Sequence, residues 1–515
     1  MSWWPVRSSR PPGPAFRSRS RSPAVQKSRS PEVQQPGSPE GEAAPVKPST
    51  SAKSPSSVKP PSIVKPPRGP ASSRTPSFSH LITTCVLALA LLVTASAVVA
   101  LAKGPRPADR AAAPAASSAR HWVNTWTAMP QLTEPGNMPP PPFTEDRAVL
   151  VDTTLRQTVR VSTGGGRVRL RFSNAFGDTP LPLTAVTVAL PLDGRAGVSA
   201  VEPGSLRQVT FSGRASATVP VGAQLVSDPL DFGLRPGSNL TVTAYLAEGQ
   251  PSRALTSHPG SRTTSYLQKA DHTRDPDLPQ ATAVNHWYLL SDVEVLSGPD
   301  AAAVAVVGDS LTDGRGSTTN GNDRWTDRFL DRLRAHPATD EVAVLNQAAG
   351  GNRVLNDGLG PNVLARLDRD VLSRSGVSWL VLFEGVNDIG TAAATPAAQR
   401  DVTAELIAAY EQIVVRAHAQ GIRVYGATLT PFGGNTMYDD PAGHREASRQ
   451  EINTWIRTSG RFDAVVDFDR AVRDPQDPRR LRPTLHDGDW LHLNPEGYRT
   501  LAAAVPLRLF HGRAG

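Results

Sequence analysis

The sequence predicts an α/β fold for residues 299–515, with a parallel sheet between helices in a three-layer α/β/α sandwich. The first observation is a series of short, nearly continuous apolar runs, as expected for strands that helices cover on both faces. The second is that longer segments between these runs carry apolar residues at helical spacing. The runs occupy residues 303–307, 342–345, 379–383, 422–429 and 464–468.

The clearest helix lies between the third and fourth runs. Thr395-Pro396 offers a capping residue and a proline for its first turn, and Gly421 follows its end. Its apolar positions are Val402, Leu406, Ile413 and Ala417. A last helix is predicted over 495–510, with Asn494 as its cap. The order of strands and helices is typical of an open parallel sheet.

A second domain, rich in strands, is predicted over residues 121–298. Residues 166–172 alternate strictly, with apolar side chains on one face and arginines on the other, which we expect to be solvated. Residues 183–190, 240–246 and 287–296 are further strands between turn-forming residues. Such spacing predicts a β-sandwich.

The first 79 residues are predicted to be a disordered basic tail. They hold 17 of the 48 prolines and many serines, a composition that buries too little apolar surface to fold. They also hold 13 Lys and Arg against 3 Asp and Glu, whereas the whole chain carries +8, so the rest is near −2. The basic character therefore belongs to the tail and gives no reason to expect nucleic-acid binding by the folded domains.

Residues 80–102 form the next segment, in which 81–102 are 22 consecutive uncharged residues, enough to span a bilayer. Basic residues before it favour a cytoplasmic N-terminus, so we expect a single-pass membrane anchor with the folded domains outside, joined by the linker 103–120. The alternative is a signal peptide cleaved near Ala100 or Ala102, which would make the protein secreted. The only cysteine, Cys85, lies in this segment, so the domains after it have no disulfide and no thiol nucleophile.

Two separated motifs offer the groups of a serine nucleophile system. Ser310 follows the first apolar run in Gly308-Asp309-Ser310-Leu311, and Asp489 precedes His492 by three residues. Serine needs an imidazole to take its proton, and the imidazole works best when a carboxylate fixes its tautomer. We therefore predict a catalytic triad of Ser310, His492 and Asp489.

Two further segments could hold the oxygen that becomes negative during acyl transfer. Residues 346–353 follow the second apolar run, and their glycines allow a backbone N–H to approach a ligand. Asn387 follows the third run and has an amide that can donate. Because the carboxyl ends of parallel strands meet at one edge of a sheet, these segments should converge on Ser310.

The four segments, in this order, resemble the blocks of the SGNH or GDSL hydrolases. Each motif alone could be a turn or a chance match, and it is their conjunction that carries the resemblance. In matching positions, Ser310 is the family serine, Gly351 the glycine of the second block, Asn387 the asparagine of the third, and Asp489 with His492 the fourth. The resemblance implies an oxyanion hole of Ser310, Gly351 and Asn387. The neighbouring Asp309, Asn352 and Asp388 are expected to support these groups.

The resemblance also implies a flavodoxin-like SGNH hydrolase domain, and the strand-rich region looks like the companion domain of secreted members similar to acetyl xylan esterases. It implies a serine esterase that acts outside the cytoplasm on short-chain acyl esters, with O-acetyl groups on carbohydrate as the expected substrate. No cofactor is implied, and the histidines lack metal-ligand spacing.

Three other functions stay open from the sequence. An O-acyltransferase would pass the acyl group of the same intermediate to a polysaccharide. A non-catalytic protein of this kind would bind cell wall or polysaccharide through its strand-rich domain, although the complete set of blocks argues against it. A scaffold would recruit cytoplasmic partners through the proline-rich tail.

Overall fold

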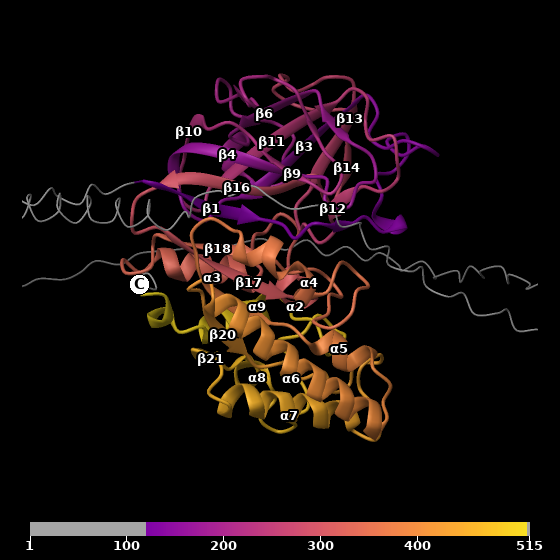
Figure 1. The fold of residues 1–515 in the computed structure, drawn as a ribbon, viewed down its shortest axis with the longest axis vertical. Helices are drawn as coiled ribbons and strands as arrows, with labels where there is room; N and C mark the ends of the chain where they lie inside the picture. Colours follow the sequence, from indigo (N-terminus) through magenta and orange to yellow (C-terminus); the bar gives the residue numbers. More distant parts are fainter. Residues whose placement is uncertain (1–119, 512–515) are drawn as a thin grey trace, which may run out of the picture. The chain divides into compact units, whose positions relative to one another are not determined.

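The computed structural model describes residues 120–511, drawn as a ribbon in Figure 1. The predicted tail 1–79, the apolar segment 80–102 and the linker up to residue 119 lie outside the described residues. Within the described range, no helix is long and apolar enough to cross a membrane.

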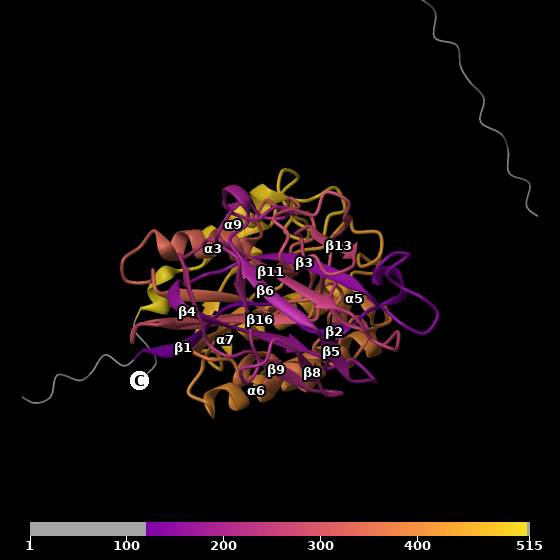
Figure 2. The same ribbon diagram turned by 90° about the horizontal axis from the view of Figure 1, so that it is seen from above.

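Residues 121–297, called the β lobe below, form two main antiparallel sheets. The first has the order β1-β16-β4-β10, with β9 also paired to β4, and the second has the order β14-β13-β3-β11-β6-β7. Figures 1 and 2 show β3, β6 and β11 side by side at the centre of the second sheet. Strands of the first sheet are β1 (His121–Thr127), β4 (Gly165–Ser173), β9 (Gln224–Val226), β10 (Leu230–Leu234) and β16 (Leu290–Ser297). Strands of the second sheet are β3 (Thr153–Arg160), β6 (Ala185–Ala189), β7 (Arg207–Gln208), β11 (Asn239–Leu246), β13 (Ser265–Lys269) and β14 (Thr282–Val284).

Short elements complete the β lobe, and both main sheets contribute to one apolar core. The short strands are β2 (Gln131–Leu132), β12 (Thr256–His258) and β15 (Trp287–Tyr288), which pair with one another, and β5 (Leu181–Leu183) with β8 (Ala217–Val219). Single 3₁₀ turns are η1 (Pro135–Asn137) and η2 (Leu192–Gly194). The predicted strand 287–296 is divided into β15 and β16, because Leu289 between them has a φ of 66°.

The arginine face of β4 differs from the expectation of a solvated surface. Arg169 and Arg171 are half-buried and face Glu294 and Asp292 of the neighbouring β16, whose side chains are each only 1% exposed. Asp292 in turn binds Arg374 at 2.5 Å. The prediction of a solvated face was wrong for these two arginines because their counter-charges come from a strand more than 100 residues away.

Residues 302–510, called the α/β lobe, contain a five-stranded parallel sheet of order β18-β17-β19-β20-β21. All five predicted apolar runs contribute a strand. The bounds are β17 (Ala302–Gly308), β18 (Val342–Asn346), β19 (Val377–Phe383), β20 (Arg423–Ala427) and β21 (Ala464–Val466). The fifth strand ends earlier than the run that predicts it, since Phe468 begins a helix capped by the Asp467 side chain.

The helices pack in two groups: α9 lies against α3 and α8, and α6 lies against α4, α5 and α7. Their bounds are α2 (Ser310–Asp313), α3 (Trp325–Arg334), α4 (Val363–Leu367), α5 (Val386–Thr391), α6 (Pro396–His418), α7 (His444–Thr458), α8 (Phe468–Val472) and α9 (Pro495–Ala504), with a π-helical turn η3 (Asp368–Leu372) after α4 and a 3₁₀ turn η4 (Leu507–Phe510) after α9. Thr395 caps α6 and Asn494 caps α9 through their side chains. The last helix is shorter than predicted, because Pro506 cannot continue it.

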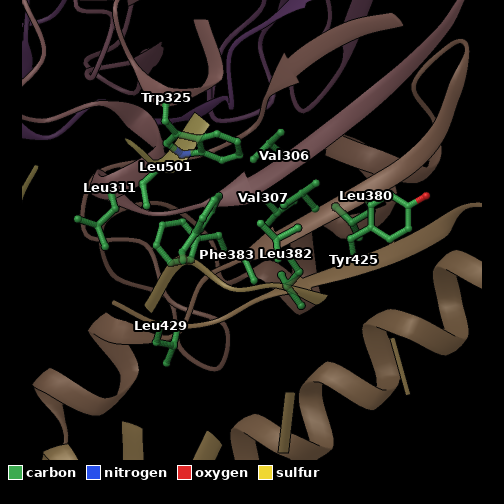
Figure 3. Packing of buried hydrophobic residues seen from close by; sticks show 14 of the residues in the cluster. Val306, Val307, Leu311, Trp325, Leu380, Leu382, Phe383, Tyr425, Leu429 and Leu501 are labelled. Carbon is green, nitrogen blue, oxygen red and sulfur yellow. The ribbon is translucent and has the colours of Figure 1, made fainter. Parts of the chain in front are cut away.

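The sheet and its helices share one large apolar core, part of which Figure 3 shows. Val306, Val307, Leu380 and Leu382 of the central strands lie in it. Trp325 is completely buried there and packs as a core side chain. The strand ends that carry Ser310 and Asn387 are thereby fixed to a rigid scaffold.

The β lobe packs directly on strands β17 and β18. Val123 of β1 lies in a small apolar cluster with Ala303, Ala343 and Leu345, where small side chains let the backbones approach. The Ser162 hydroxyl donates to the Val344 carbonyl at 3.0 Å, so polar bonds join the lobes as well. The two lobes therefore form one packed unit.

Candidate active site

Ser310 lies where β17 ends and the short helix α2 begins. Asp309 caps this helix, because its carboxylate accepts the Leu311 N–H at 2.9 Å. The turn directs the Ser310 hydroxyl into a cleft while its backbone stays attached to the central strand. The apolar strand and the polar cap in the sequence thus account for where the serine is placed.

A continuous hydrogen-bonded chain joins Ser310 to Asp489. The Ser310 Oγ lies 2.8 Å from His492 Nε2, and His492 Nδ1 lies 2.6 Å from Asp489 Oδ2. The other carboxylate oxygen of Asp489 accepts the backbone N–H groups of Leu491 and His492. The structure therefore brings together the three residues of the predicted triad.

The electrostatics of the Ser310–His492–Asp489 hydrogen bonds suit proton transfer. An ionised carboxylate only accepts hydrogen bonds, so the proton of a neutral imidazole belongs on Nδ1 and leaves Nε2 to accept from Ser310. Burial lowers the pKa of His492 against the opposing effect of Asp489, which keeps the imidazole neutral at neutral pH. Burial would raise the pKa of Asp489, but hydrogen bonds from the His492 side chain and from the backbone hold it below its usual value.

Three donors face the same cleft as the serine hydroxyl. Neither the Ser310 N–H nor the Gly351 N–H donates to an acceptor within residues 120–511, whereas the Gly350 N–H binds Asp313. One hydrogen of the Asn387 amide goes to the Asn352 carbonyl at 2.8 Å, and the Tyr438 hydroxyl fixes its oxygen at 2.7 Å. The second amide hydrogen has no acceptor in the described part of the chain. Ser310, Gly351 and Asn387, the predicted oxyanion residues, all line the cleft.

The three residues predicted to support the site lie behind it. The Asn352 side chain is buried and bonded to the Leu359 and Pro361 carbonyls and to Arg366, which fixes the loop after β18. Asp388 accepts the Val354 and Leu355 N–H groups and so ties this loop to α5. Burial raises the pKa of Asp309 to about 7 and that of Asp388 to about 6.

The cleft has a volume of about 680 Å³ and is lined by both lobes. This is within the usual range of small-molecule sites. The β lobe contributes Glu134, Arg262, His286 and neighbouring residues, none of which we predicted from the sequence. Nothing local marks them, since they reach the serine only through the packing of two distant segments.

One bond between the lobes leads directly to the loop that carries Gly351. His258 of β12 lies 2.9 Å from Asp313 through Nε2, and its Nδ1 lies 3.1 Å from the Met129 carbonyl. The other oxygen of Asp313 accepts the Gly350 N–H at 3.1 Å. A side chain at Gly260 would collide with Asp313, so the β lobe backbone is pressed against this carboxylate. The β lobe thus takes part in holding the loop beside the serine.

Comparison with known proteins agrees with this geometry. Residues 306–500 match the model of the GDSL-like lipase/acylhydrolase family. Among solved structures, an acetylxylan esterase of Geobacillus stearothermophilus is 19% identical, with 41% of this chain and 95% of that chain covered and a TM-score of 0.32. An acetyl xylan esterase, AlAXEase, is 21% identical over 39% and 96% of the two chains with a TM-score of 0.31, and a GDSL-like lipase of Bacteroides thetaiotaomicron is 17% identical over 39% and 84% with a TM-score of 0.29.

A search of curated proteins finds no match to this chain. The family match begins within β17, the strand that precedes Ser310, and ends within α9, the helix that follows His492. The chain therefore contains a domain of the GDSL-like lipase/acylhydrolase family, and it is a carboxylic ester hydrolase.

Proposed function

We propose that the protein is a serine esterase that hydrolyses short-chain acyl esters through an acyl-enzyme. This proposal rests on two hydrogen bonds. Ser310 Oγ lies 2.8 Å from His492 Nε2, and His492 Nδ1 lies 2.6 Å from Asp489 Oδ2. The free donors beside it supply the second requirement of the chemistry, because stabilising the oxyanion is often the largest catalytic effect.

In the first half of the reaction, the Ser310 oxygen attacks the ester carbonyl while His492 Nε2 takes the hydroxyl proton. The Ser310 and Gly351 N–H groups and the Asn387 amide hold the negative oxygen of the tetrahedral intermediate. The protonated His492 then gives its proton to the departing alcohol, which leaves an acyl ester on Ser310. Asp489 stabilises the imidazolium and does not itself take the proton.

In the second half, water attacks the acyl-enzyme while His492 again takes a proton. Collapse of this second intermediate returns the proton to Ser310 and releases the carboxylic acid. No step requires a cofactor. The open cleft leaves room for an alcohol larger than the acyl group, and we propose O-acetyl groups on carbohydrate as substrates, as the similarity to acetyl xylan esterases suggests.

Product analysis tests hydrolysis against acyl transfer. The purified chain, given an O-acetylated donor and an excess of oligosaccharide, is expected to release mainly free acetate, since the cleft around Ser310 is open to water. Chromatography of the products measures the ratio. A product mixture dominated by acetylated oligosaccharide would assign the protein as an acyltransferase that uses the same intermediate.

We further propose that the catalytic domains lie outside the cytoplasm, held by the apolar segment 81–102 behind its basic tail. Protease added to intact cells is then expected to digest the part of the chain after residue 120 and to spare the tail, while the whole chain sediments with membranes. Immunoblotting with antibodies to the two parts measures this. A soluble form that begins near residue 103 would show instead that the segment is a cleaved signal, and full protection in intact cells would contradict both arrangements.

A further inference from the structure

Two arginines in the catalytic cleft form no ion pair within residues 120–511, although Arg262 interacts electrostatically with the Asp313 carboxylate at longer range. Arg262 comes from the β lobe, and Arg315 follows helix α2, so the two lobes each contribute one positive charge to the cleft that Ser310 and His492 line. Within residues 120–511, neither guanidinium makes an ion pair or a side-chain hydrogen bond.

The carboxylates of the cleft are engaged elsewhere. Asp489 binds His492, Asp313 binds His258 and the Gly350 N–H, and Glu134 accepts from the Gln131 amide and from Asn137 at 2.9 Å. None of them lies within 4.0 Å of Arg262 or Arg315. The two arginines are therefore the charged groups of the cleft that remain available to a ligand.

The backbone at Arg262 is held in a costly conformation. Its φ is 50°, a region that residues other than glycine seldom adopt. The Arg262 carbonyl accepts the Asn320 N–H at 2.9 Å, the Asn320 side chain accepts the Thr264 N–H at 2.8 Å, and Arg324 binds the Ser261 carbonyl. The α/β lobe thus fixes the loop that presents Arg262. The side chain is half-buried, and its Nε is buried without a partner.

A buried N–H without an acceptor is costly, and arginine forms its strongest bonds with carboxylate and phosphate groups. Both arginines are also close enough to His492 to lower its pKa. We propose that Arg262 and Arg315 form an anion subsite, so that the esterase prefers substrates that carry a carboxylate near the scissile ester. An O-acetylated uronic acid residue in an acidic polysaccharide has this chemistry. The inference rests on the proposed function and adds the class of substrate to it.

Matched esters test the subsite. The purified full chain is assayed with neutral 4-nitrophenyl acetate, with 3-carboxy-4-nitrophenyl acetate, whose anion is on the alcohol side, and with the 4-nitrophenyl monoester of succinate, whose anion is on the acyl side. The measured quantity is kcat/KM of each variant relative to the unchanged protein, so that the different intrinsic reactivities of the esters cancel.

Arg262→Gln and Arg315→Gln are each expected to lower kcat/KM about 10-fold or more for at least one carboxylated ester, as for loss of a bond to a charged group. The loss for the neutral ester should be much smaller when it is measured at a pH above the pKa of His492, where removal of a nearby positive charge leaves the imidazole neutral. Arg315 is exposed, so its replacement does not threaten folding, and Arg262→Lys should retain part of the preference because it keeps the charge. Arg147→Gln removes the same charge from an exposed site of the β lobe outside the cleft and is expected to change none of the ratios.

A second experiment uses polymers and compares acetate release from an O-acetylated polyuronate with that from an O-acetylated neutral xylan. The unchanged protein is expected to favour the polyuronate, and Arg315→Gln should reduce that preference. Equal losses on neutral and carboxylated esters, or no loss on either, would overturn the subsite. Because turnover of the neutral ester requires the triad and needs no bond to an anion, the esterase function can stand while the subsite fails.

Discussion

Replacing Ser310 with alanine is expected to lower kcat on a short-chain aryl ester by about 10³-fold or more. The change removes the oxygen that forms the acyl-enzyme. The Ser310 hydroxyl has one partner, His492 Nε2, so its loss leaves no buried carboxylate or amide without a bond, and little change in the thermal unfolding temperature is expected. Steady-state kinetics and thermal unfolding of both proteins measure the two effects.

The control for this change is Ser317→Ala, whose hydroxyl binds the Gly314 carbonyl at 2.6 Å in the same loop but does not line the cleft. His492→Ala should cost about as much as Ser310→Ala, and the double variant should lose little more, because the two side chains act as a unit. Asn387→Ala, which removes one of three donors, should cost less, about 10² to 10³ in kcat. Near-normal turnover by Ser310→Ala would contradict the mechanism.

Breaking the bond between His258 and Asp313 is expected to affect both stability and catalysis. His258→Ala leaves the Asp313 carboxylate buried without its imidazole partner, and loss of a hydrogen bond to a charged group costs about 1.5–3 kcal/mol in the free energy of unfolding. The same carboxylate holds the Gly350 N–H, next to the Gly351 donor. We expect kcat to fall about 10-fold or more with little change in KM, since small displacements of a catalytic group are costly.

A second bond between the lobes offers a matched control. The side chains of Asp292 and Arg374 are each 1% exposed and lie 2.5 Å apart, but neither touches the loop that carries Gly351. Asp292→Asn should therefore lower the free energy of unfolding while kcat stays near normal at a temperature where the variant is folded. His258→Gln, which keeps a donor near Asp313, should recover part of kcat. Equal loss of kcat from Asp292→Asn and His258→Ala would reduce the role of His258 to general stability.

The sequence locates Ser310, Asn387 and the loop around Gly351 because each follows an apolar run. Apolar runs of this kind form parallel strands, and parallel strands end at a common edge, so residues that follow them meet in space. His492 and Asp489 follow from a different signal, the capped start of the last helix at Asn494. These local signals suffice for the groups of the α/β lobe that line the cleft around the serine.

Features that depend on contacts between distant segments were not predictable in the same way. Arg262 and His258 reach the cleft only because the β lobe packs on β17 and β18, and no pattern within residues 256–264 indicates that packing. The predicted solvation of the β4 arginines was wrong for the same reason, since their partners Asp292 and Glu294 lie on β16. The predicted ends of some elements differ by a few residues from those in the structure. For example, α9 ends before Pro506, whereas the prediction extended it to residue 510.

The shared cleft has a consequence for how such a chain can change over time. A β lobe with its own core resembles an interchangeable module, one that recombination could remove or replace at residues 298–301 without cutting a strand. Yet a foreign module would arrive without the histidine that faces Asp313, and without a small residue where Gly260 lies against that carboxylate. The two halves are therefore constrained to be inherited together, and substitutions in the Pro259–Thr264 loop should be accompanied by substitutions around Asp313 and Asn320.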